Sequence, residues 1–85
     1  MEIEYTLKAQ EDLAYWKKKN NITVLKKIRK LIESMLETPF EGVGKPEALK
    51  YNLSGTWSRR ITQEHRLVYE VENDLIVVLA MRGHY

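Results

Sequence analysis

The sequence predicts an α+β domain in which a hairpin of two helices packs on one face of a mostly antiparallel, twisted sheet. Three observations lead to this fold class. An alternating stretch at 1–6 is typical of a short strand, two amphipathic stretches follow over about 7–37, and four short strand-like stretches separated by turn residues fill 49–82. Because the chain has 85 residues and contains no repeat or linker, we expect one domain over residues 1–85, with the order β-α-α-β-β-β-β.

The first strand is predicted over "MEIEYT", where Ile3 and Tyr5 lie on one face and the glutamates on the other. Thr6 can then cap a helix that runs to about Lys19, because its hydroxyl can accept a hydrogen bond from a free backbone N–H in the first turn. Three apolar residues of this helix recur at i, i+4 and i+7 and predict a stripe facing the core, namely Ala9, Leu13 and Trp16.

A second helix is predicted over about 22–37, after a turn at Asn20 and Asn21. So short a connection predicts an antiparallel helical hairpin. Pro39 ends the second helix, because its ring cannot continue a helix and it has no N–H. Basic residues fill one face of this helix, and the other face is apolar, with Val24, Leu25, Ile28, Leu31, Ile32 and Met35.

An irregular segment, "TPFEGVGKPEA" (38–48), separates the helices from the strands. Loops of this kind carry function more often than regular elements do. The last strand is apolar at seven consecutive positions, 75–81, so we expect both of its faces to be covered and its place in the sheet to be central. The four predicted strands are "LKYNL" (49–53), "WSRRIT" (57–62), "RLVYEVE" (66–72) and "LIVVLAMR" (75–82).

The composition excludes several classes of site. There is no cysteine, so disulfides and thiolate metal sites are absent. The two histidines are 19 positions apart without an acidic cluster beside them, which gives no metal-ligand spacing, and we expect neither a metal nor another cofactor. No window approaches the roughly 18 apolar residues of a membrane span, and the first ten residues hold no apolar signal-peptide core, so we expect a cytoplasmic protein.

The charge is unevenly distributed, although the net charge is only +2. Residues 1–12 hold four acids and one lysine, or −3, whereas residues 13–32 hold seven bases and no acid, or +7. Residues 45–66 hold five bases and two acids, or +3. A basic belt of this kind would attract nucleic acid or an acidic protein, and a solvated helix face is the alternative.

Glu47 is the first candidate for chemistry. It lies in "GKPEALK", between Lys45 and Lys50, and Pro46 restricts the backbone just before it. The two cations would hold the carboxylate in its charged form, which suits a general base. The alternative is a solvated glutamate in a loop.

Arg59, Arg60 and Arg66 form the second candidate group. On an alternating strand Arg60 and Thr62 share one face while Arg59 lies on the other. If "QEH" is a three-residue hairpin loop, Thr62 pairs with Arg66, and the side chains of Arg60 and Arg66 point the same way. Two guanidinium groups on one face suit a phosphate, because each is a planar fork of donors. The alternative is surface arginines partnered by glutamates of the same strands.

His84 and Tyr85 end the chain and form the third group. His84 can donate a proton near neutral pH, and the adjacent terminal carboxylate should favour its charged form. The ring of Tyr85 can stack on a nucleobase. The alternatives are a frayed tail for His84 and an apolar plug on the core for Tyr85, while His65 lies in a turn and is interpreted as structural or solvated.

Together these groups suit metal-free cleavage of RNA. A base takes the proton from the ribose 2′-hydroxyl, arginine stabilises the charge that develops on the phosphorane-like transition state, and an acid protonates the leaving 5′-oxygen. A missing acid or base would cost roughly 10²–10⁴ in rate.

The stretch "TPFEGVGKPEALKYNLSGTWSRRITQEHRLVYEV" and the ending "HY" closely resemble the YoeB toxins, also called Txe, of the RelE/ParE toxin superfamily. The resemblance covers the whole chain, including "AYW" at 14–16. It implies a RelE/YoeB-like fold and a toxin of a type II toxin–antitoxin module, a ribosome-dependent mRNA interferase that cuts mRNA in the decoding site. It also implies a YefM/Axe-like antitoxin with a disordered acidic tail, and homodimers are common among such toxins.

Carried over by motif, the resemblance implies four catalytic residues. The general base falls on Glu47, the transition-state arginine on Arg66, the general acid on His84 and the orienting tyrosine on Tyr85. The residues expected to contact RNA are Lys50 and Arg60, which match the motif, and the neighbouring Lys45 and Arg59. The basic second helix would face the RNA of the ribosome, with salt-sensitive binding.

Two positions depart from the family pattern. Ala48 stands where the family often has proline, so the loop that carries Glu47 could be less rigid. Gly83 stands where a bulkier residue is common, and the freedom of glycine could loosen the aim of His84. Two other functions stay open: a non-catalytic, ParE-like protein poison, and a degenerate toxin that acts only as co-repressor with its antitoxin.

Overall fold

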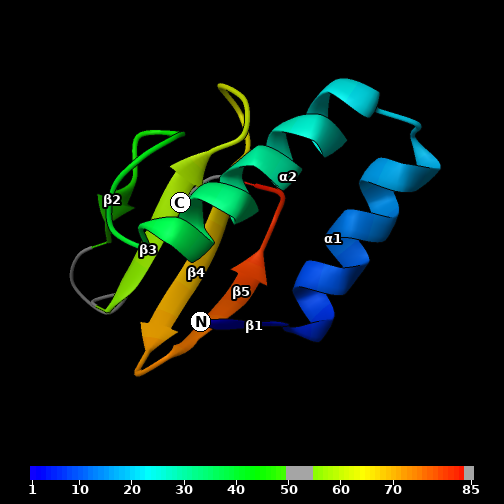
Figure 1. Cartoon of the computed structure of the whole chain (residues 1–85). Helices are drawn as coiled ribbons and strands as arrows, with labels where there is room; N and C mark the ends of the chain where they lie inside the picture. The colour runs from blue at the N-terminus through cyan, green and yellow to red at the C-terminus, as the bar shows by residue number, and fades with distance from the viewer. Residues whose placement is uncertain (50–54, 84–85) are drawn as a thin grey trace.

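The computed structural model describes residues 1–49 and 55–83, and it confirms the α+β fold class (Figure 1). Two helices pack on a five-stranded sheet whose strand order is β1-β5-β4-β3-β2. The elements are β1 (Glu2–Tyr5), α1 (Leu7–Lys18), α2 (Ile22–Glu37), β2 (Glu47–Ala48), β3 (Thr56–Arg60), β4 (Arg66–Glu72) and β5 (Leu75–Ala80).

Both helices begin where the sequence predicts, and each begins at a side-chain cap. The hydroxyl of Thr6 accepts from the backbone N–H of Ala9 at 3.1 Å, and the side-chain oxygen of Asn21 accepts from the N–H of Val24 at 3.1 Å. Each cap satisfies one of the free donors of the first helical turn. The short turn between the helices contains Asn20 in the left-handed region, at φ 54°.

The core lies between the helical hairpin and one face of the sheet. Of the predicted stripe on α1, Ala9 and Trp16 are buried while Leu13 is half-buried and packs against them. The main contributors from α2 are Val24, Ile28, Leu31 and Met35, and those from the sheet are Leu67, Tyr69, Ile76, Val78 and Met81.

β5 lies inside the sheet, as predicted, because it pairs in parallel with β1 and antiparallel with β4. The expectation that both of its faces are covered holds only in part. Ile76 and Val78 are buried on the helix side, whereas Leu75 and Val77 are only half-buried, since within the described residues the helices cover one face of the sheet. Ala80, beyond the bulge, is buried on the other face together with its partner Val68. The long apolar run therefore reflects strand position more than two covered faces.

A β-bulge near the end of β5 changes which side chains face the core. Val68 pairs with Ala80 and Tyr69 with Val78, so Leu79 is the extra residue. A bulge re-aims the residues that follow it. The alternation therefore shifts by one, and Met81, rather than Ala80, joins the core next to Val78.

Two predicted strand positions differ from the structure. The strand predicted over 49–53 begins earlier, at Glu47–Ala48, and residues 50–53 lie outside the described residues. The predicted pairing of Thr62 with Arg66 is wrong, because Arg60 pairs with Arg66. The turn closes at Thr62 instead: the N–H groups of Ile61 and Thr62 both donate to the carbonyl of His65, at 2.9 and 3.1 Å, which ends the ladder two residues early.

Candidate active site

The face of the sheet opposite the helices carries a carboxylate and two guanidinium groups. Glu47 pairs with Ser58 across β2 and β3, and Arg60 pairs with Arg66 across β3 and β4. Because side chains alternate along a strand, Ser58 and Arg60 share this face. Arg60 and Arg66 thus point the same way, as predicted, through a register different from the predicted one.

Arg66 lies at the centre of this group. Its Nη1 donates to the hydroxyl of Ser58 at 3.0 Å and lies 3.9 Å from Oε2 of Glu47. The side chain of Arg66 is 16% exposed and that of Glu47 is 59% exposed. So long and exposed an ion pair adds little to stability. Its value lies in geometry: a mostly buried guanidinium, held by Ser58, lies beside an exposed carboxylate.

The segment that follows β5 lies next to Arg66. The backbone N–H of Arg66 donates to the carbonyl of Gly83 at 3.0 Å, and the N–H of Gly83 donates to Nδ1 of His65 at 3.0 Å. The ring of His65 also packs edge-on against Trp16, with centroids 4.9 Å apart. His65 is therefore structural, and it fixes the last described residue next to Arg66.

Gly83 adopts a backbone conformation that glycine favours, with φ 109°. A Cβ placed there would meet no atom of residues 1–49 and 55–83 within 4 Å, so within this part of the chain the backbone angle, and not space, favours glycine. Both polar groups of the Gly83 backbone are bonded, while the expected effect of Gly83 on the aim of His84 lies outside the described residues.

His84, Tyr85 and Lys50 lie outside the described residues. Of the other expected RNA-binding residues, Lys45 and Arg60 are exposed. Lys45 lies two residues before Glu47 and has φ 52°, while the N–H of Arg60 donates to the carbonyl of Gly44 at 2.8 Å. This hydrogen bond joins the loop between α2 and β2 to β3, close to Glu47 in the sequence.

The expectation that Arg59 contacts RNA is wrong. Its residue is 0% exposed, on the helix side of β3. All five N–H donors of its guanidinium are used inside the protein. Nε donates to the hydroxyl of Tyr69, Nη1 to the hydroxyl of Ser34 and the carbonyl of Val43, and Nη2 to the carbonyls of Thr38 and Glu41.

Arg59 therefore ties the loop that precedes Glu47 to the core. Tyr69 completes the contact, since its hydroxyl donates to the carbonyl of Pro39 at 2.7 Å. Burial raises the pKa of Tyr69, and the hydrogen bond and charge of Arg59 lower it in part. The alternation predicted that Arg59 and Arg60 lie on opposite faces, but no local pattern indicated which face is the inner one.

Two residues that make structural contacts near the site were missed by sequence reasoning. Ser58 orients Arg66. Asp12 is buried on α1, and its Oδ2 accepts from the N–H of Met81 at 2.9 Å. The signal for Asp12 was its spacing, since Ala9, Asp12 and Trp16 recur at i, i+3 and i+7 and so share the core face.

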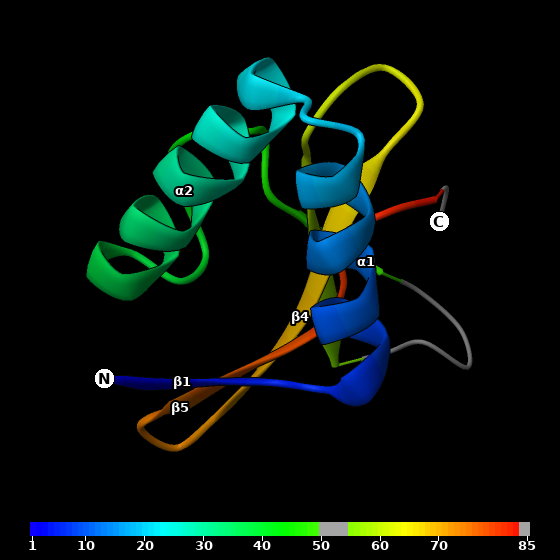
Figure 2. The same ribbon diagram turned by 90° about the vertical axis from the view of Figure 1, so that its right-hand side faces the viewer.

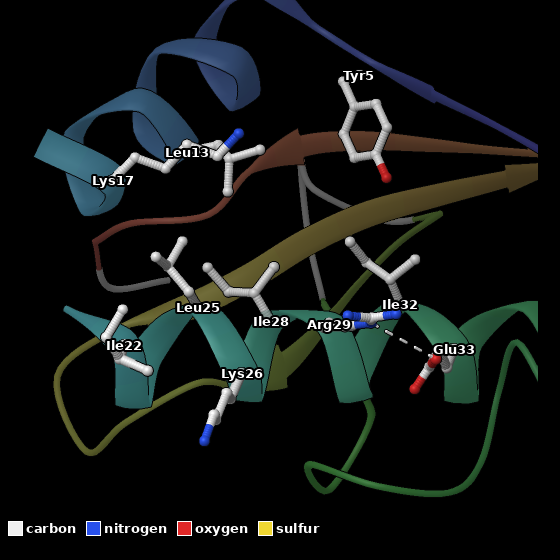
Figure 3. Close-up of a pocket in the computed structure, with 10 residues that line it drawn as sticks. All are labelled: Tyr5, Leu13, Lys17, Ile22, Leu25, Lys26, Ile28, Arg29, Ile32 and Glu33. Carbon is white, nitrogen blue, oxygen red and sulfur yellow. Dashed lines mark ion pairs between the residues drawn. The ribbon is translucent and has the colours of Figure 1, made fainter. Parts of the chain in front are cut away.

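An apolar groove lies on the other side of the molecule, between α1, α2 and β1 (Figure 3). Its volume is about 580 Å³. Apolar side chains of both helices form its walls, and basic side chains lie at its rim. The lining includes Tyr5, Leu13, Ile22, Leu25, Ile28 and Ile32, with Lys17, Lys26 and Arg29. Since β1 and β2 are opposite edges of the sheet, this groove is separate from Glu47.

The described part of the chain has neither a metal-binding cluster nor a membrane-spanning helix. Among residues 1–49 and 55–83, no three histidine, cysteine or acidic residues are grouped closely enough to hold a metal ion. Over the same part of the chain, each helix is too short or too polar to cross a membrane.

This fold is that of bacterial toxins whose structures have been solved. A YoeB/ParE toxin from Agrobacterium tumefaciens superposes with a TM-score of 0.94 over 100% of both chains, at 41% identity. A YoeB from Staphylococcus aureus has been solved as a dimer, with a TM-score of 0.90 and 42% identity over 100% of this chain and 98% of that one. A YoeB from Staphylococcus aureus has also been solved in a YoeB–YefM complex, with a TM-score of 0.88 and 43% identity over 100% of this chain and 98% of that one.

Sequence comparison identifies the family. The family model that matches residues 5–85 is described as "YoeB-like toxin of bacterial type II toxin-antitoxin system". Toxin YoeB of Escherichia coli K12 is 49% identical over 85 residues, which is 100% of both chains. The chain belongs to the YoeB-like toxin family of bacterial type II toxin–antitoxin systems.

Proposed function

We propose that this toxin is a ribosome-dependent mRNA interferase, an endoribonuclease that cuts mRNA in the ribosomal A site and so stops translation. The observation that carries the proposal is the position of Arg66. Its guanidinium lies 3.9 Å from the carboxylate of Glu47, and its backbone N–H bonds to Gly83, the residue before His84. Arg66, the proposed cation, therefore contacts both Glu47, the proposed base, and the residue that precedes His84, the proposed acid.

The proposed reaction needs no metal. Glu47 accepts the proton of a ribose 2′-hydroxyl, and the 2′-oxygen attacks the adjacent phosphorus. A 2′,3′-cyclic phosphate forms as the bond from phosphorus to the 5′-oxygen breaks, and His84 donates the proton that the leaving oxygen takes. Tyr85 orients the acid or stacks on a base.

Arg66 stabilises the charge on the phosphate oxygens in the transition state. Its contacts with Ser58 and Glu47 both use Nη1, and within residues 1–49 and 55–83 no partner is recorded for Nη2. A guanidinium held before the substrate arrives needs no reorganisation during the reaction, which is what electrostatic stabilisation requires.

Binding to the ribosome is proposed to depend on phosphate contacts. Lys45, Lys50 and Arg60 surround Glu47 and Arg66 in sequence or register, and the exposed face of α2 adds further cations. Contacts of this kind are independent of sequence and weaken as salt is raised. The proposal therefore includes a steep salt dependence.

The partner proposed for regulation is a YefM/Axe-like antitoxin. The related toxin from Staphylococcus aureus has been solved with YefM and also as a dimer. An acidic antitoxin segment would cover basic surface of this toxin and block the site. We propose the same partner here, with a homodimer as a further assembly in a cytoplasmic protein.

The test is an in vitro translation reaction with programmed ribosomes and excess toxin, followed by primer extension on the mRNA. We expect cuts at A-site codons for the wild type and none for Glu47→Ala. Intact message with the wild type would overturn the proposal. If Glu47→Ala and His84→Ala remained fully toxic in cells, a binding poison would replace catalysis.

A further inference from the structure

Helix α1 holds both polar groups of one backbone residue just beyond β5. Oδ2 of Asp12 accepts from the N–H of Met81 at 2.9 Å, and Nε1 of Trp16 donates to the carbonyl of Met81 at 2.9 Å. Asp12 is 2% exposed and Trp16 is 6% exposed. Their i, i+4 spacing places both side chains on one face of α1.

A buried carboxylate needs compensation. Removing a charge from water is costly unless it is paired and hydrogen-bonded. Asp12 has both, because Nζ of Lys8 lies 2.6 and 2.7 Å from its oxygens and Nε of Arg82 lies 3.8 Å from Oδ1. An apolar residue would fill this place in the core at lower cost, so the acid is explained best by the backbone group that it binds.

The chain on either side of Met81 is held in the same way. The hydroxyl of Thr6 donates to the carbonyl of Leu79, the bulge residue, at 3.0 Å. The guanidinium of Arg82 lies over the ring of Tyr15, 4.0 Å from its centroid. Gly83 is bonded to His65 and Arg66. Figure 2 shows this segment leaving the sheet beside α1.

We propose that Asp12 and Trp16 are positioning residues for the cleavage reaction. By clamping the backbone at Met81 they fix the start of the segment that leads, through Gly83 and its bond to Arg66, to His84 in the sequence. The inference rests on the proposed function, since it assigns the clamp a role in the aim of the general acid. A displacement of about 1 Å at a reacting group can cost on the order of 10²-fold in rate.

Three variants separate the clamp from simple packing. Trp16→Phe removes the indole N–H and keeps a ring in the core. Asp12→Ala removes the acceptor, whereas Asp12→Asn removes the charge and keeps an oxygen that can accept from Met81. Lys8→Ala is the matched control, because it removes an ion pair of Asp12 and leaves the contact with Met81 in place.

The first readout is the kinetics of ribosome-dependent cleavage. We expect kcat to fall by about 10-fold to 10²-fold in Trp16→Phe and Asp12→Ala, with KM unchanged. Asp12→Asn should recover most of the rate, and Lys8→Ala should match the wild type. An unchanged kcat in Trp16→Phe, or an equal loss in Lys8→Ala, would overturn the inference.

The second readout is ¹⁵N relaxation of the backbone amides of residues 81–83, which does not depend on catalysis. We expect Trp16→Phe to raise fast motion at these amides while the amides of β4 stay as in the wild type. Unchanged relaxation would overturn the inference. If the wild type did not cleave mRNA, the proposed function would fall, and relaxation alone would still decide whether the clamp holds the chain end. If Asp12→Ala did not fold, Trp16→Phe would supply the result.

Discussion

Arg66 is the residue on which the proposed chemistry depends. Its backbone and its side chain serve different purposes: the N–H holds Gly83, while the guanidinium bonds to Ser58 and faces Glu47. Strand β4 therefore fixes both the cation and the approach of the chain end. A substitution at this position can alter the side-chain function alone, since the backbone contact remains.

Arg66→Lys tests the need for a planar fork of donors. Lysine keeps the positive charge but binds a phosphate as a point charge. We expect kcat to fall by about 10²–10³-fold, the scale seen when one transition-state donor is lost. Single-turnover cleavage on programmed ribosomes measures this rate. A kcat within a few-fold of the wild type would show that charge alone is sufficient.

Gly83→Ala tests the backbone angle next to the proposed acid. Gly55 offers a matched control, because both glycines have positive φ (109° at Gly83 and 96° at Gly55), and a Cβ at either would meet no atom of the described residues within 4 Å. Each alanine should destabilise the fold by about 1–3 kcal/mol, the cost of such a conformation. Only Gly83→Ala should lower kcat as well, and equal kinetics in the two variants would contradict this role.

At the scale of elements, the loop between α2 and β2 is built around Arg59. The side chain comes from β3, but three of its acceptors are carbonyls of the loop, at Thr38, Glu41 and Val43. This loop leads directly to Lys45 and Glu47. The position of the proposed base therefore depends on a buried arginine on the opposite face of the sheet.

Arg59→Ala and Arg60→Ala form a matched pair of neighbours. The first leaves several buried acceptors without a donor, at about 1–3 kcal/mol each, so we expect a loss of at least about 3 kcal/mol in the free energy of unfolding. The second removes an exposed side chain and should change that free energy by about 0.5 kcal/mol or less. Urea denaturation measures both, and similar losses would refute the assignment.

We expect the raised pKa of Tyr69 to make the protein less stable at alkaline pH. Burial raises its pKa above the ordinary value of 10.0. As pH rises past about 10, the unfolded chain loses the phenolic proton while the folded chain keeps it, so stability is lost up to the folded pKa. Tyr69→Phe should lower stability at about pH 8 but flatten its decline toward about pH 10.5. A residual slope is expected, because burial also raises the pKa of Tyr5.

The features that the sequence predicted well are local ones. The helix starts follow from Thr6 and Asn21, whose side chains bond three residues ahead. The register of the β3–β4 hairpin was not predicted correctly, because the turn closes through Thr62 and the carbonyl of His65. The inner face of β3 also depends on distant groups, since the partners of Arg59 lie 10 to 25 residues away.

At the scale of the whole molecule, the sheet separates two surfaces. Glu47 and Arg66 lie on the face away from the helices, near the β2 edge, while the apolar groove lies on the helix side next to β1. The residue types of the proposed catalytic groups made them candidates, but their roles came from the family motif, because Glu47 and Arg66 are brought together only by the folded sheet. A contact between residues so far apart in the sequence leaves no periodic signal in it.

The described core is complete by Met81, and this leads to a prediction for the chain end. The core residues extend from Ala9 to Met81, and the last described hydrogen bonds are those of Gly83. Deletion of Tyr85 should therefore leave the midpoint of thermal unfolding nearly unchanged and abolish most mRNA cleavage, because the proposed orienting ring is lost. On the same preparation, circular dichroism measures the midpoint of thermal unfolding and primer extension measures mRNA cleavage. The matched control is Leu7→Ala, a change at an exposed residue that follows β1, the sheet edge opposite β2, and it should leave both properties intact. Normal cleavage by the shortened protein would refute the role of Tyr85, and unfolding at a much lower temperature would show that the last residue belongs to the core.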